Sequence, residues 1–211
     1  MVDLTKLHEA ILKGDAKTAV AVTREALAAN VDPQELVTNH MIPAMEEVGR
    51  RFECQEYFVP ELLLSARAMK GALELIRPLL VEQGAPTAGR VVIGTVKGDL
   101  HDIGKNLVAS MLEGAGFEVV DLGTDVAPAR IVSEIVERRP QIVALSALLT
   151  TTMPFMKTTI EELSKAGVRE HVKVMIGGAP VTQQYADQIG ADGYSDNANG
   201  AVTVARRLAG Q

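Results

Sequence analysis

A histidine lies between two aspartates in residues 95–106, Thr-Val-Lys-Gly-Asp-Leu-His-Asp-Ile-Gly-Lys-Asn. The neutral imidazole of His101 is a good ligand for a transition metal. A metal-bound histidine is usually held by an acceptor at its other ring nitrogen, and Asp99 is two residues away. Gly104 would let a large flat ligand approach the backbone closely. Taken alone, the Asp-x-His spacing is also typical of a solvated loop histidine.

The same loop does not match two common nucleotide-binding motifs. It lacks the Gly-x-Gly-x-x-Gly of dinucleotide-binding folds. It also departs from the phosphate-binding P-loop, because five residues separate Gly98 from Gly104 and an asparagine replaces the magnesium-binding Ser or Thr. A hydrolase triad of Asp99, His101 and Ser146 is disfavoured, because the Gly-x-Ser-x-Gly nucleophile elbow is missing.

Short runs rich in Val and Ile alternate with helical patterns from residue 90 onward. This alternation predicts an α/β domain whose parallel sheet is covered on both faces. Ligands bind such sheets beyond the carboxyl ends of the strands, so the loops after the strands are the candidate site. The expected strands are 90–96, 117–121, 141–146, 172–176 and a fifth at 191–195. The expected helices are 103–115, 128–138, 153–166, 181–189 and 198–208.

The preceding residues contain helical patterns only. Apolar positions over 59–81 recur with a 3.6-residue period, which gives one buried stripe. Asp32 and Pro33 suit the N-cap and first position of an earlier helix. Four amphipathic helices with short connections predict a bundle over residues 1–84. The Pro- and Gly-containing stretch that follows is typical of a linker, and a second domain is expected at 90–211.

Composition excludes several classes of function. Hydrophobic residues make up 47% and charged residues 23%, as in ordinary globular proteins. The net charge of -6, without a basic cluster, argues against a nucleic-acid partner. Neither a signal peptide nor an apolar run near the roughly 20 residues of a membrane helix is visible, so a cytoplasmic protein without a membrane partner is expected. The lone Cys54 is expected to be a spectator thiol, and His8, His40 and His171 lack ligand spacing.

Three ordered motifs resemble those of cobalamin-binding domains. Residues 99–104 match Asp-x-His-x-x-Gly, residues 146–152 (Ser-Ala-Leu-Leu-Thr-Thr-Thr) resemble the second motif and residues 177–179 the third. In that family the histidine replaces the cofactor's own benzimidazole as the lower cobalt ligand, and the displaced nucleotide tail enters a slot beside the sheet. The resemblance implies a Rossmann-like, flavodoxin-like domain in which His101 binds cobalt and Asp99 is its hydrogen-bond partner. Thr152 then stands where the family often has a serine that bonds to this aspartate.

The resemblance also implies which residues line the tail slot. Ser146, Leu148 and Thr150 alternate at the end of the third expected strand, and alternation would put them on one face. The Gly177-Gly178 pair would offer a surface without side chains, although it also fits a strand-to-helix turn. Tyr194 falls where the family closes the slot, although an ordinary sheet-end aromatic also fits.

The segment 47–70 resembles the helical cap that precedes the cobalamin domain in methionine synthase and in corrinoid proteins of methyltransferase systems. By resemblance, Phe52, Val59 and Leu62 would lie over the upper face of the corrin, although each also suits a bundle core. Apolar walls exclude water, and the cap must move for a partner, so the linker at 83–89 is the natural hinge. The expected corrinoid-binding residues are Gly98, Asp99, His101, Asp102, Ile103, Gly104, Ser146, Leu148, Thr150, Thr152, Gly177, Gly178, Tyr194, Phe52, Val59 and Leu62, with His101 as the metal ligand.

The function implied by the resemblance is that of a non-catalytic methyl carrier. A donor-specific methyltransferase would methylate the cobalt, and a second methyltransferase would pass the methyl group to a pterin or thiol. A reductive activase is the third expected partner. The cofactor would be cobalamin or a related corrinoid, alternating between methylcob(III)alamin and cob(I)alamin. The alternative is a cobalamin-dependent regulator or sensor, although such proteins usually carry an added DNA-binding module that is not evident here.

Overall fold

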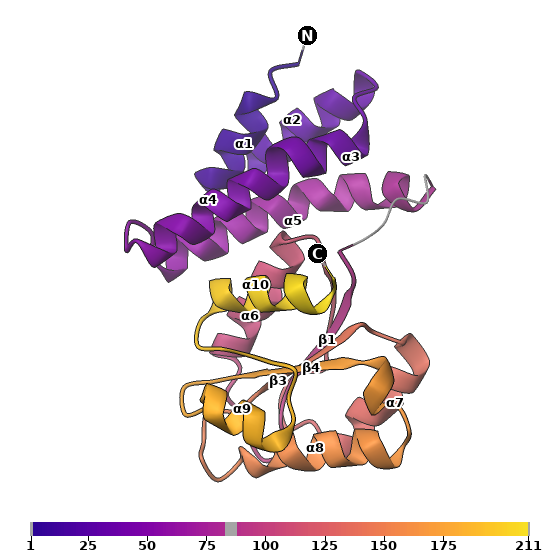
Figure 1. Cartoon of the computed structure of the whole chain (residues 1–211). Helices are drawn as coiled ribbons and strands as arrows, with labels where there is room; N and C mark the ends of the chain where they lie inside the picture. Colours follow the sequence, from indigo (N-terminus) through magenta and orange to yellow (C-terminus); the bar gives the residue numbers. More distant parts are fainter. Residues whose placement is uncertain (1, 83–87, 211) are drawn as a thin grey trace. The chain divides into compact units, whose positions relative to one another are not determined.

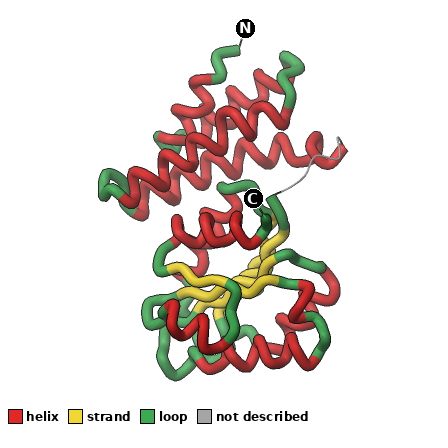
Figure 2. Tube along the Cα trace, viewed as in Figure 1, coloured by secondary structure: helices red, strands yellow, loops and turns green. Residues whose placement is uncertain are grey.

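The chain folds into two compact units that correspond to the two sequence patterns. The computed structural model describes residues 2–82 and 88–210. One unit comprises residues 1–87 with 113–116, and the other comprises residues 88–112 and 117–211. The first is helical, and the second holds the strands (Figure 2). Most of the expected linker, residues 83–87, lies outside the described residues. Its role as a hinge therefore stays a prediction.

The helical unit confirms the expected bundle of four helical rods (Figure 1). The first helix packs against the second and the fourth, and the second packs against the fifth. Apolar residues on the inner faces are fully buried, among them Leu7, Ile11, Leu36, Met41, Met69 and Ile76. The bounds are α1 Thr5–Leu12, α2 Ala16–Ala28, α3 Pro33–Leu36, the π-helical turn η1 Val37–Met41, α4 Ile42–Glu53 and α5 Val59–Glu82.

A π-helical turn interrupts the third rod. As expected, Pro33 opens α3 and the Asp32 side chain caps it, accepting a hydrogen bond from the Gln34 N–H at 3.2 Å. The rod then passes through η1 and continues as α4, with Pro43 in its first turn. Proline has no N–H to donate, and its ring clashes with the carbonyl four residues earlier in an α-helix. The wider π turn accommodates Pro43 without ending the rod.

The second unit is a five-stranded parallel sheet in the order β2-β1-β3-β4-β5, with helices on both faces. Helices α6 and α10 cover one face, and α7, α8 and α9 cover the other (Figure 1). This is the flavodoxin-like order, in which ligands bind near the point where the chain changes direction between β1 and β3. The bounds are β1 Arg90–Thr95, α6 Ile103–Gly114, β2 Glu118–Asp121, α7 Pro128–Arg138, β3 Ile142–Ser146, α8 Pro154–Lys165, η2 Arg169–His171, β4 Lys173–Gly177, α9 Gln183–Ile189, β5 Gly193–Ser195 and α10 Ala198–Leu208.

The register of the sheet aligns the ends of four strands. Thr95 pairs with Ser146, Ser146 with Gly177, and Gly177 with Ser195. The inner strands are almost wholly buried because helices cover both faces. The loops after β1, β3, β4 and β5 therefore leave the sheet along one edge, where the sequence predicts the site.

Candidate functional site

The carboxylate of Asp99 joins the loops that follow β1 and β3. The residue is fully buried, yet its carboxylate accepts five hydrogen bonds. Oδ1 accepts from the main-chain N–H of His101 at 3.1 Å and lies 2.7 Å from the ring Nδ1 of the same residue. Oδ2 accepts from the N–H groups of Leu148 and Leu149 at 2.8 and 3.2 Å. The Thr152 hydroxyl also donates to Oδ2, at 2.7 Å.

These hydrogen bonds keep Asp99 ionised. Burial alone would raise its pKa, because a charged group is disfavoured away from water. Hydrogen bonds from Thr152, from His101 and from the Leu148 N–H stabilise the charged form and outweigh burial, so the pKa of Asp99 lies well below its ordinary 3.8. The single Thr152 hydroxyl hydrogen also lies near the Leu149 carbonyl oxygen, 2.9 Å from Oγ1. The charged carboxylate is the stronger of these two acceptors.

The ionised carboxylate fixes the state of the His101 ring. Because Asp99 can only accept, Nδ1 of His101 carries the hydrogen, and in the neutral ring Nε2 keeps its lone pair. The His101 side chain is 50% exposed. Its main-chain carbonyl is held as well, since the Thr95 hydroxyl donates to it at 2.9 Å. An oriented imidazole with an available nitrogen, backed by a buried carboxylate, is the arrangement that metal-ligating histidines use.

Exposed apolar side chains accompany this imidazole. Leu100 and Ile103, in the same loop and at the start of α6, are 73% and 85% exposed. Leu148 and Leu149 of the loop after β3 are also exposed. A Cβ at Gly104 would meet no atom within 4 Å, so this backbone borders open space, while close approach of a ligand there stays a prediction. Four exposed apolar side chains and a free imidazole nitrogen suit a large, flat, largely apolar ligand that carries a metal.

The neighbouring residues Asp102 and Gly98 have local structural roles. Asp102 is exposed, and its carboxylate accepts a hydrogen bond from the Asn106 side chain at 3.0 Å within the first turn of α6. Gly98 occupies the left-handed region at φ +80°, in the turn that leads from β1 to Asp99. Their predicted contacts with a corrinoid stay predictions.

The predicted alternation of Ser146, Leu148 and Thr150 along one strand face is wrong beyond its first member. Strand β3 ends at Ser146, and the chain turns immediately afterwards. The physical reason is that the main-chain N–H groups of Leu148 and Leu149 turn toward the Asp99 carboxylate instead of continuing the ladder. Leu148 and Thr150 therefore lie in an exposed loop, and a period of two does not apply there.

The glycine pair after β4 has a packing role of its own. A Cβ at Gly178 would lie 1.9 Å from the Ala147 carbonyl oxygen, and the residue has φ +131°. A Cβ at Gly177 would lie 3.1 Å from the Ser195 carbonyl oxygen. Close backbone packing in the turn after β4 is therefore enough to explain both glycines. A surface without side chains for the nucleotide tail stays a prediction. Tyr194 is half-buried and packs against the apolar cluster of the sheet.

The sequence analysis assigned no role to two residues that contribute hydrogen bonds at the site. Leu149 contributes a main-chain N–H, which no side-chain pattern announces. Asp125 accepts a hydrogen bond from the Gly98 N–H at 2.7 Å through Oδ1. Its place in the chain could have indicated a role, because Asp125 follows β2 and so belongs to a loop at the edge of the sheet where ligands bind.

The predicted cap residues of the helical unit differ in exposure. Phe52 is partly buried near the end of α4, and Leu62 is fully buried in α5. Val59, at the start of α5, is 41% exposed, and its neighbour Phe58 is 62% exposed. Apolar side chains are therefore presented to solvent at Phe58, in the loop between α4 and α5, and at Val59, the first residue of α5.

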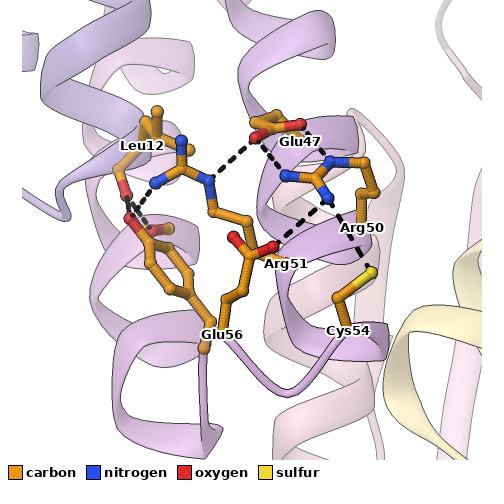
Figure 3. Close-up of polar contacts among 8 residues, drawn as sticks. Leu12, Glu47, Arg50, Arg51, Cys54 and Glu56 are labelled. Atoms are coloured by element: carbon orange, nitrogen blue, oxygen red, sulfur yellow. Dashed lines mark hydrogen bonds and ion pairs between the residues drawn. The ribbon is translucent and has the colours of Figure 1, made fainter.

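A polar network holds this loop (Figure 3). The Glu47 carboxylate accepts from Nε of both Arg50 and Arg51, at 2.7 and 2.8 Å. Hydrogen bonds from these two guanidinium groups lower the pKa of Glu47 to about 2. Arg51 also donates to the Tyr57 hydroxyl at 3.2 Å, and that hydroxyl donates to the Leu12 carbonyl at 3.1 Å. The network therefore links α4 and the loop after it to the end of α1.

Comparison with known proteins identifies the family. Residues 89–203 match the B12 binding domain family, and residues 4–77 match a second family with the same description. The chain belongs to the B12-binding corrinoid proteins. Its cofactor is accordingly cobalamin or a related corrinoid, as the motif around His101 implies.

Relatives cover nearly the whole corrinoid protein. It is 49% identical to trimethylamine corrinoid protein 2 of Methanosarcina mazei over 94% of this chain and 92% of that protein. A cobalamin-binding protein from Desulfitobacterium hafniense has a similar structure, with a TM-score of 0.81, 35% identity and 99% coverage of both chains. A chain of the methanol:cobalamin methyltransferase complex MtaBC from Methanosarcina barkeri gives a TM-score of 0.84 at 30% identity, over 98% of this chain and 80% of that one.

Among the described helices, none combines the length and apolar character that crossing a membrane requires.

Proposed function

We propose that this protein is a non-catalytic carrier that transfers a methyl group on corrinoid cobalt between two methyltransferases. The observation that carries the proposal is the His101 imidazole, held by the buried Asp99 carboxylate at 2.7 Å with its other nitrogen available. A corrinoid bound there supplies a cobalt atom that can accept and give up a methyl group. The protein itself supplies binding, orientation and the exclusion of water.

The residues of the α/β unit divide these tasks. His101 is the proposed lower cobalt ligand, and Asp99 orients its ring from a buried position. Thr152 holds the Asp99 carboxylate through its hydroxyl. The exposed leucines at 148 and 149 would border the corrin, and their main-chain N–H groups keep that loop beside Asp99. Ser146, Gly177, Gly178 and Tyr194 remain the proposed lining of the nucleotide-tail slot.

The helical unit, proposed as a cap domain over residues 1–84, would cover the upper face of a corrinoid held by the domain at 90–211. Phe58 lies in the loop that the Glu47–Arg51–Tyr57 network holds in place, and Val59 follows it as the first residue of α5; both have exposed apolar side chains. Phe52 lies close by in sequence at the end of α4. Apolar groups in this position would keep water and competing reactants from the cobalt.

The names of the relatives support a methyltransferase as a partner of this protein. High identity to a trimethylamine corrinoid protein supports a donor methyltransferase that acts on a methylated amine. Similarity to a chain of a methanol:cobalamin methyltransferase complex supports direct docking to such an enzyme. A second methyltransferase with a pterin or thiol acceptor and a reductive activase complete the proposal. We also propose a cytoplasmic location, which suits the exposed free thiol of Cys54.

Electron paramagnetic resonance on the protein loaded with cob(II)alamin tests the ligand assignment. We expect nitrogen hyperfine coupling from His101 in the wild type and its loss in His101→Ala. His171→Ala, which removes an exposed histidine of the same unit, is the matched control and should keep the coupling. A His101→Ala spectrum identical to that of the wild type contradicts the assignment.

Methyl transfer is tested separately with purified donor enzymes. The loaded and reduced protein is mixed with methyltransferases for trimethylamine, dimethylamine, monomethylamine or methanol, each with its substrate, and the visible spectrum is followed. A spectral change with at least one methylated amine and none with methanol supports the proposed donor class. A change with methanol alone contradicts that class, and no change with any donor contradicts the carrier function.

A further inference from the structure

The loop after β2 forms two hydrogen bonds with the backbone that leads to His101. The Asp125 N–H donates to the Asp99 carbonyl oxygen at 3.0 Å. In return, Oδ1 of Asp125 accepts from the Gly98 N–H at 2.7 Å. Asp125 therefore holds two consecutive residues through a reciprocal pair of hydrogen bonds. We name this pair the Asp125 clamp.

Both residues that the side-chain hydrogen bond of the clamp joins, Gly98 and Asp125, have an unusual backbone conformation. The Asp99 N–H donates to the Val96 carbonyl oxygen at 3.2 Å, which closes a tight turn with Gly98 at its third position. Gly98 has φ +80° and Asp125 has φ +52°, so both occupy the left-handed region. Glycine adopts this conformation freely, and Asp and Asn tolerate it better than other residues. Aspartate thus combines the required backbone with a side chain that reaches the turn.

The clamp is anchored to the sheet. The Thr95 N–H donates to the Gly123 carbonyl oxygen at 3.0 Å, and the Val126 N–H donates to the Thr95 carbonyl oxygen at 3.0 Å. The Gly123 N–H donates to Asp121 at 2.8 Å, and the buried Lys105 ammonium forms an ion pair with the same carboxylate. The loop that carries Asp125 is therefore fixed on both sides of this residue.

We propose that Asp125 is a positioning residue that sets the direction in which His101 meets the corrinoid. The inference rests on the proposed function. Asp99 is held at its carboxylate by the loop after β3 and at its backbone by Asp125. Without the hydrogen bond from the Gly98 N–H, Asp125 holds the turn only through its own N–H, which donates to the Asp99 carbonyl oxygen. The Asp99 carboxylate then has a wider range of positions, and so does the imidazole that it orients. Fewer protein molecules would then hold the ring in the direction that reaches cobalt.

Two substitutions isolate the side-chain half of the clamp. Asp125→Gly keeps the left-handed backbone and the N–H that donates to Asp99, but it removes the acceptor for the Gly98 N–H. Asp125→Asn keeps an acceptor oxygen and tolerates the same backbone. Arg139→Gly is the matched control, because Arg139 also has a positive φ, +47°, in the same unit at the end of α7.

The measurement is the fraction of bound cob(II)alamin that shows histidine nitrogen coupling, alongside thermal unfolding of each apoprotein. We expect Asp125→Gly to lower the ratio of histidine-bound to histidine-free cobalt about three- to tenfold, the effect of one lost hydrogen bond. Asp125→Asn should restore the wild-type ratio. Both glycine variants should remain folded, and Asp125→Gly should lower the thermal midpoint by no more than the few degrees that one lost hydrogen bond costs. Faster amide exchange at Gly98 in the Asp125→Gly apoprotein would verify the broken bond.

Two results overturn the inference. One is a wild-type ratio in Asp125→Gly, which would show that the clamp does not position the imidazole. The other is an equal loss in Asp125→Asn, which would show that the acceptor oxygen is not the cause. A wild-type protein without any histidine coupling contradicts the proposed function itself and is recognised before the variants are compared.

Discussion

Nδ1 of His101 and Oδ1 of Asp99 lie 2.7 Å apart, and the acceptor of this pair is fully buried while the imidazole is half exposed. The buried partner is fixed by four further hydrogen bonds from His101 itself and from the loop after β3. An exposed ring thus takes its direction from an anchor that solvent does not reach. The stability of the apoprotein and the orientation of the His101 ring therefore depend on the same carboxylate.

Asp99→Asn should destabilise the apoprotein by about 2–4 kcal/mol, because an amide cannot satisfy all donors that converge on the carboxylate. Whichever way the amide turns, its NH₂ group faces N–H or O–H groups that need an acceptor. Urea unfolding measures the loss. Asp102→Asn is the control, because Asp102 is exposed, and it should change stability by less than about 0.5 kcal/mol. Equal stability of the two variants contradicts this account.

The contribution of Asp99 should depend on pH in one direction. Its pKa is lower in the folded state than the ordinary 3.8, so the folded state binds fewer protons than the unfolded state in acid. The stabilisation is therefore fully present above about pH 5 and declines as the pH falls below 3.8 toward the folded-state pKa. Urea unfolding of wild-type and Asp99→Asn apoproteins should give a constant difference from pH 7 to 5 and a smaller one at pH 3. A difference that grows in acid rejects this linkage.

Thr152 offers a finer test of the same anchor. Thr152→Val removes the hydroxyl that donates to Asp99 and should cost about 1–2 kcal/mol, since one donor to a buried charge is lost. Thr152→Ser keeps the hydroxyl and should retain more of the stability. Both are measured by urea unfolding of the apoprotein. If valine proves at least as stable as serine at this position, the hydroxyl does not support the carboxylate.

The sequence predicts the elements well because their causes are local. Each expected strand is present with ends within two residues of the expected ones, since runs of Val and Ile and the turns that bound them are short-range signals. The Asp99–His101 pair is equally local, because its partners are only two positions apart in the chain. Asp32 capped its helix as expected for the same reason.

The features that the sequence analysis missed have non-local causes. Strand β3 ends at Ser146 as expected, but the alternation does not continue beyond it, because the Leu148 N–H donates to a carboxylate 49 positions away in the chain. Gly178 is needed because the backbone at Ala147 passes against it. Asp125 acts on Gly98 from 27 positions away. Only the folded sheet brings these partners to one edge, so no local pattern carries the information.

Two glycines of the site should respond oppositely to alanine. Gly178→Ala places a Cβ against the Ala147 carbonyl oxygen at a positive φ and should cost about 2–5 kcal/mol of apoprotein stability. Gly104→Ala meets open space in a helix and should leave stability unchanged or raise it by up to about 1 kcal/mol. Because Gly104 is proposed to lie against the ligand, its variant should nevertheless bind cobalamin more weakly in a titration. Unchanged affinity in a stable Gly104→Ala protein contradicts close approach at this residue.

The proposed cap residues Leu62 and Val59 differ in burial, so their substitutions should affect stability differently. Leu62 is fully buried, so Leu62→Ala should cost about 2–5 kcal/mol in urea unfolding through lost burial and a cavity. Val59 is 41% exposed, so Val59→Ala should cost less than about 1 kcal/mol. If the exposed face shields a bound corrinoid, Val59→Ala should still accelerate photolysis of methylcobalamin bound to the protein. Val136→Ala, which shortens an exposed valine of α7 in the other unit, controls for a general effect. Equal photolysis rates in the Val59→Ala and Val136→Ala proteins would show that Val59 does not cover the cofactor, whatever the stability of the bundle.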